Sequence, residues 1–112
     1  MAIQFSVAVA NALLDSIETT IGAAPILTIR TGAAPANCAA ANSGTVLATI
    51  TLPSDWMAAA SAGSKAKAGT WQDTAADASG TAAHYRIHDS GGTVCHQQGT
   101  VGTSASDLIV DS

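Results

Sequence analysis

Four side chains that could bind a metal ion lie close together in the sequence: His84, His88, Cys95 and His96. Zinc prefers imidazole nitrogen and thiolate sulfur as ligands. If residues 82–88 form a strand, His84 and His88 share a face but lie roughly 13 Å apart, because a strand rises about 3.3 Å per residue. That separation is too long for one ion, since a metal–ligand bond is only about 2 Å long.

A hairpin would have to bring these ligands together across two strands. Residues 82–88 and 93–100 have the composition of strands, and the glycine-containing stretch between them is typical of a tight turn. A two-residue loop there would place Arg86 opposite Cys95 and Tyr85 opposite His96, so that the possible ligands point to two faces. The sequence therefore predicts no metal site, and it predicts a solvated or interfacial role for these polar residues.

Motifs of enzymatic chemistry are also missing from the sequence. There is no Gly-x-Ser-x-Gly elbow, neither cysteine stands in a recognisable nucleophile motif, and no glycine run ends in Gly-Lys-Ser or Gly-Lys-Thr. Five of the ten glycines follow Thr, Ser or Gly, as turn residues do. We expect no catalytic residue and no cofactor, and an enzyme is the least favoured class of function.

Composition limits the partners of the chain. It has 112 residues, enough for one domain, and its net charge of -4 comes from scattered groups without a basic patch, which argues against nucleic acid. No apolar run approaches the roughly 20 residues that cross a bilayer, and the N-terminus does not resemble a signal peptide. We expect assembly in a cytoplasm, where Cys38 and Cys95 remain reduced; one disulfide is the alternative in an oxidising compartment.

The elements that position these residues follow from local patterns. Ser6 is a candidate N-cap and Gly22 a candidate stop for a helix, which predicts a helical segment over residues 1–22. Residues 23–112 form a β-rich domain, with expected strands at 26–31, 45–52, 68–72, 82–88, 93–100 and 107–112. The fold class is mainly β (α+β): an N-terminal helix and a small antiparallel β-sandwich or barrel of about six short strands.

Five apolar residues are candidates for contacts with another subunit: Leu14, Ile17, Trp56, Leu108 and Ile109. The helical stripe that contains Leu14 and Ile17 packs either on the sheet or across a neighbouring subunit. Trp56 is equally suited to a core and to an interface. The last strand needs a partner for its edge. Because alanine supplies much of the 47% hydrophobic content, we expect a thin core and a homo-oligomer, a dimer or trimer.

Three runs of sequence resemble a known family. They are residues 29–38 (Ile-Arg-Thr-Gly-Ala-Ala-Pro-Ala-Asn-Cys), 52–57 (Leu-Pro-Ser-Asp-Trp-Met) and 83–90 (Ala-His-Tyr-Arg-Ile-His-Asp-Ser). The chain resembles the capsid decoration (cement or staple) proteins of tailed phages, most of all those of epsilon-fifteen-type short-tailed phages. The resemblance implies a virion protein on the outer capsid surface that clamps neighbouring major capsid protein subunits and is assembled in the host cytoplasm. The alternative is a tail, fibre or adhesin module of a phage particle.

Overall fold

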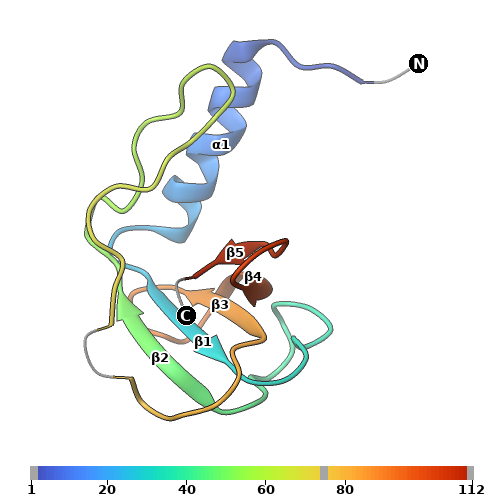
Figure 1. Ribbon diagram of the computed structural model, residues 1–112. Helices are drawn as coiled ribbons and strands as arrows, with labels where there is room; N and C mark the ends of the chain where they lie inside the picture. The colour runs from blue at the N-terminus through green and yellow to red at the C-terminus, as the bar shows by residue number, and fades with distance from the viewer. Residues whose placement is uncertain (1–2, 74–75, 111–112) are drawn as a thin grey trace.

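The described part of the chain forms one helix followed by five short strands, and the mainly β fold predicted from the sequence is confirmed (Figure 1). The structure is a computed structural model that describes residues 3–73 and 76–110. Its elements are α1 (Val7–Ile21), β1 (Ile26–Arg30), β2 (Val46–Thr51), β3 (His84–His88), β4 (Cys95–Gly102) and β5 (Leu108–Ile109). Residues 68–72, expected to be a strand, are irregular, since their glycine and small residues make no ladder with a neighbour.

The strands form a single sheet in the order β2-β1-β3-β4-β5, which curls into half a barrel. All neighbouring strands are antiparallel except β5, which runs parallel to β4. The final apolar run therefore pairs back onto an earlier strand. Asp111 and Ser112, which the sequence placed in the same strand, lie outside the described residues.

The hairpin between β3 and β4 has a different register from the predicted one. His88 lies opposite Cys95 and Arg86 opposite Gln98, with an irregularity between Ile87 and His88. The connection is longer than two residues because the Asp89 carboxylate accepts hydrogen bonds from the backbone N–H groups of Thr93 and Val94, at 2.9 and 3.2 Å. A side chain thus closes the turn, and the predicted pairing of Arg86 with Cys95 is wrong.

The two faces of the sheet differ in polarity because side chains alternate along each strand. One face carries the buried apolar residues, among them Leu27, Ile50, Tyr85 and Ile87, which pack with Trp56 and Val101 in the core. The opposite face carries the buried polar residues Thr28, Arg30, His84, Arg86 and His88. Burial on both faces explains why all five residues of β3 are buried.

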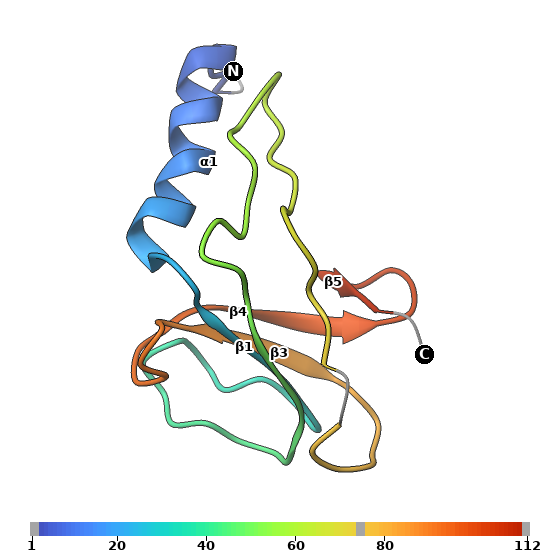
Figure 2. The same ribbon diagram turned by 90° about the vertical axis from the view of Figure 1, so that its left-hand side faces the viewer.

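The helix α1 projects from the sheet instead of lying across it (Figure 2). It begins where the Ser6 hydroxyl accepts a hydrogen bond from Val9 N, and it ends at Gly22, whose φ of 92° suits glycine. Both helix boundaries were predicted correctly. Ile21, at the base of the helix, is its only residue that is buried. Residues 57–67 form an irregular hairpin that runs beside α1, with isolated bridges between Met57 and Lys67 and between Ser61 and Ser64.

Candidate subunit-binding surface

One edge of α1 is polar, and it binds the hairpin of residues 57–67. Asn11 Oδ1 accepts a hydrogen bond from Gly63 N at 3.0 Å, and Asp15 Oδ1 accepts one from Ala60 N at 2.9 Å. Asn11 and Asp15 are four residues apart and therefore lie on one edge of the helix. The helix is held against the rest of the chain by this polar edge.

Lys65 provides the charged part of this contact. Its Nζ lies 2.6 Å from Asp15 Oδ1 and 3.0 Å from Glu18 Oε1, and its side chain is only 3% exposed. The hydrogen bond to Asp15 raises the pKa of Lys65, and the same bond lowers the pKa of the Asp15 carboxyl. Residues far along the chain thus supply the partners of Asp15 and Glu18.

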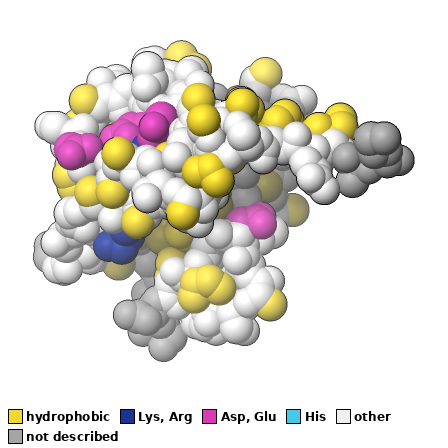
Figure 3. All heavy atoms as spheres, turned by 90° about the horizontal axis from the view of Figure 1, so that it is seen from above, with side chains coloured by type: hydrophobic (Ala, Val, Ile, Leu, Met, Phe, Trp, Pro, Cys, Tyr) yellow, Lys and Arg dark blue, Asp and Glu magenta, His cyan; other side chains and the backbone are white. Residues whose placement is uncertain are grey.

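The opposite side of the helix presents an apolar stripe to solvent. We define the apolar stripe as five exposed residues: Val9, Leu13 and Ile17 on that side of α1, and Ile3 and Phe5 in the segment before it. Ile3 is 85% exposed, Phe5 64% and Leu13 53%. Figure 3 shows apolar side chains following one another along this projecting part of the molecule. Most domains bury the apolar face of a helix, whereas here the polar edge makes the hydrogen bonds to the rest of the chain and this apolar side stays exposed.

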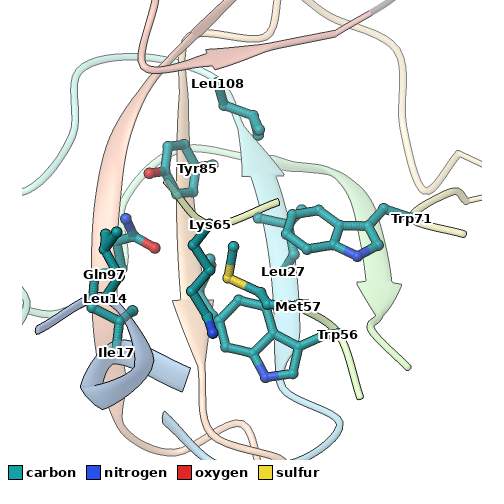
Figure 4. A pocket seen from close by; sticks show the side chains of 11 residues that line it. Leu14, Ile17, Leu27, Trp56, Met57, Lys65, Trp71, Tyr85, Gln97 and Leu108 are labelled. Carbon is teal, nitrogen blue, oxygen red and sulfur yellow. The ribbon is translucent and has the colours of Figure 1, made fainter. Parts of the chain in front are cut away.

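Two of the predicted interface residues, Leu14 and Ile17, lie at the lower part of this helix. They line a cavity of about 220 Å³ that is bounded on its other sides by Trp56, Lys65 and Tyr85, among others (Figure 4). Leu14 is half-buried there, whereas Ile17 retains 42% exposure and belongs to the stripe as well. Ile17 is thus accessible to another protein, and Leu14 is accessible only in part.

Most of the apolar stripe was not among the residues singled out from the sequence. The helical residues predicted as interface candidates, Leu14 and Ile17, belong to one row of the helix. A second row, Val9, Leu13 and Ile17, has regular spacings of four residues and could have revealed the broader face. Ile3 and Phe5 precede the helix, so no helical period includes them.

Trp56 belongs to the core, so its prediction as an interface residue is corrected. It is 1% exposed, and its indole Nε1 donates a hydrogen bond to the carbonyl oxygen of Gly22 at 2.9 Å. Its ring centroid lies 5.9 Å from that of Trp71, which also packs against the core. The burial follows from the position of Trp56 at the junction of the helix end, the hairpin and the sheet.

Leu108 and Ile109 form the short strand β5 at one edge of the sheet. Leu108 pairs with Val101 and packs against the core, whereas Ile109 is 56% exposed. Both residues border a wider cavity of about 610 Å³ over β1 and β2. Of the two, only Ile109 presents most of its side chain to a possible partner.

The polar face of the sheet is covered by the loop of residues 32–44, which Arg86 holds in place. The Arg86 guanidinium donates hydrogen bonds to Asn42 Oδ1 at 2.6 Å and to the carbonyl oxygen of Cys38 at 2.9 Å. Gln98 Nε2 adds a bond to the carbonyl oxygen of Pro35 at 2.7 Å. These groups therefore hold the loop on the sheet and are not free for a ligand.

The buried polar face also affects the protonation of His88. Burial lowers the pKa of His88, and the charges of Arg86 and Arg30 lower it further, although Asp89 acts in the opposite direction. The pKa is therefore below the value of about 6.5 that an unperturbed histidine has. The unfolded chain takes up this proton first as the pH falls, so protonation opposes folding.

We expect the contribution of His88 to stability to be complete above about pH 6.5 and to decrease below it. The free energy of unfolding can change by at most about 1.4 kcal/mol per pH unit, the limit for the uptake of one proton. Urea unfolding between pH 7.5 and 5 measures this slope for the parent and for His88→Gln, which should lack it. His96→Gln is the matched control, because His96 is exposed on the neighbouring strand. An identical slope in the parent and His88→Gln would contradict this assignment.

The described residues provide little for chemistry at a metal. Within residues 3–73 and 76–110, no three His, Cys, Asp or Glu side chains gather closely enough to hold an ion. His84 Nδ1 lies 2.7 Å from the carbonyl oxygen of Gly32, so the His84 ring contacts the loop of residues 32–44.

No helix in the described part of the chain is long and apolar enough to span a membrane. Searches of protein-family models, curated protein sequences and solved structures find no match to this chain.

Proposed function

We propose that this protein is a structural, non-enzymatic subunit that decorates the capsid shell of a phage and clamps neighbouring major capsid protein subunits. The observation that carries the proposal is the apolar stripe on a projecting helix. Contiguous apolar surface of this kind marks sites of protein binding, because covering it removes it from water. The resemblance of residues 29–38, 52–57 and 83–90 to capsid decoration proteins supports the choice of partner.

The arrangement of α1 suits a clamp. Its polar edge is bound to residues 60–65, and these contacts hold the helix in its projecting orientation. The exposed apolar stripe can therefore lie against a second protein. The curled sheet serves as the body from which the helix projects (Figure 2). Each copy would cover a boundary between capsid subunits, and a protein that binds only the assembled shell stabilises that shell by mass action.

We further propose that the protein acts on the outer capsid surface as a dimer or trimer. A homo-oligomer would bring two or three apolar stripes to adjacent capsid subunits and raise the overall affinity through multivalency. Ile109, exposed on the edge strand β5, is the candidate contact within such an oligomer. The oligomer would assemble with the particle in the host cytoplasm.

Copy number in purified particles tests the proposed function. Quantitative mass spectrometry against the major capsid protein should give on the order of hundreds of copies per particle, as expected for a protein that follows the symmetry of the shell. A low-resolution density map should place the additional density on the outer surface. A few to tens of copies at one vertex would instead indicate a tail, fibre or adhesin module, and absence from the particles would overturn both assignments.

A further inference from the structure

Two cysteines far apart in the sequence lie side by side in the folded chain. Cys38 Sγ and Cys95 Sγ are 3.1 Å apart, although 57 positions separate the residues. Cys38 belongs to the loop that covers the polar face of the sheet, and Cys95 begins β4. Both are free thiols and both are partly exposed, so small reagents in solution can reach them.

The neighbouring contacts keep the pair together. The Cys38 carbonyl accepts a hydrogen bond from Arg86, and the turn that carries Cys38 is closed by Asn37 Oδ1, which accepts from Ala40 N at 3.0 Å. Cys95 is fixed by the pairing of β4 with β3 opposite His88. A disulfide needs an S–S distance of about 2.05 Å, so the sulfur atoms have only about 1 Å to move.

We propose that Cys38 and Cys95 are a site of reversible oxidation, at which a low-molecular-weight disulfide such as oxidised glutathione converts the two thiols into one intramolecular disulfide. One cysteine thiolate attacks the reagent and expels one thiolate. The second cysteine thiolate then attacks the resulting mixed disulfide at the protein sulfur and expels the other. The reagent is reduced to two thiols, the protein loses two hydrogen atoms, and the new bond joins the loop of residues 32–44 to β4.

The chemistry at the site sets the pH dependence of the reaction. Burial raises the pKa of the Cys38 thiol, and the adjacent Cys95 thiol raises it further, although Arg86 lowers it. Because the thiolate is the reacting form, the bond should form faster as the pH rises above neutrality. The proximity of the sulfur atoms depends on the fold, whatever protein the domain binds.

The test compares folded and urea-unfolded protein in the same glutathione redox buffer. The folded chain should lose both free thiols and two hydrogen atoms in intact mass. A tryptic digest without reductant should then link the peptides 31–65 and 87–112, each of which contains one cysteine. The equilibrium constant for the bond should be about 30-fold or more higher in the folded chain, and by linkage the bond should raise the folding equilibrium constant by the same factor.

Single variants and the reaction products separate the possible outcomes. Cys38→Ser and Cys95→Ser should each form only a mixed disulfide with glutathione, or a dimer between chains. If the folded parent also gains two glutathiones, dimerises through its cysteines or does not react, the proposal is overturned. Equal equilibrium constants for disulfide formation in the folded and unfolded chains would likewise overturn the proposal, because they would show that the fold does not favour the bond. Slower hydrogen exchange in residues 32–44 after oxidation should accompany the expected result.

Discussion

A double variant of the apolar stripe, Phe5→Ser with Leu13→Gln, should fold as the parent does and bind capsid particles about 10- to 100-fold more weakly. Phe5 is 64% exposed and Leu13 53%, so each has more than half of its surface left to bury against a partner. Full burial of such a side chain contributes about 1.5–3 kcal/mol, from which the expected loss follows. Glutamine is nearly as good a helix former as leucine, and Phe5 precedes the helix, so α1 should persist.

The measurement is binding to particles from which the native protein has been stripped, alongside urea unfolding of each variant alone. The matched control introduces the same two residues at nearby exposed positions outside the stripe, as Gln4→Ser with Ala12→Gln. The control should bind as the parent does. Parent-like binding by the stripe variant would place the capsid contact elsewhere, with the exposed Ile109 as the next residue to test.

Replacing Trp56 with alanine should cause the largest loss of stability of any single change considered for this chain, about 3–5 kcal/mol. The side chain is 1% exposed and contacts both the sheet core and the helix end. Because small domains are stable by only about 5–15 kcal/mol, the variant should be largely unfolded at low concentrations of urea. The expected loss reflects the cavity that such a large side chain leaves behind.

Trp56→Phe separates the hydrogen bond from the packing. It keeps an aromatic ring but removes the N–H that donates to the Gly22 carbonyl oxygen, which should cost about 1–3 kcal/mol and loosen the helix end first. Trp71→Phe is the comparison, since Trp71 is half-buried and its Nε1 donates to Ala68 within a loop. Urea midpoints should fall more for Trp56→Phe than for Trp71→Phe. Equal urea midpoints for the two variants would show that the hydrogen bond from Trp56 to Gly22 does not stabilise the packing of α1 on the core.

Local sequence signals were sufficient to predict most elements of this fold. Ser6 and Gly22 bound the helix because a capping hydroxyl and a residue able to adopt positive φ act within one turn of the chain. The strands β1 and β2 follow from short β-branched runs, and the region of the β3–β4 turn follows from its glycines. These features depend on residues only a few positions apart, so they can be predicted from one sequence.

Contacts between distant segments decided the rest. The apolar stripe faces outward because Asn11 and Asp15 accept hydrogen bonds from the backbone N–H groups of residues 63 and 60. The spacing of residues within the helix does not predict these contacts. Trp56 is buried because the helix end and the sheet meet around it, and Cys38 faces Cys95 because Arg86 holds a loop on the polar face. The sequence alone determined the helix and most of the strands, since those choices are local, although it also predicted a strand at residues 68–72 that does not form. Which faces remain open to partners was decided only by the tertiary structure, because it depends on hydrogen bonds and burial between segments that fold together from far apart.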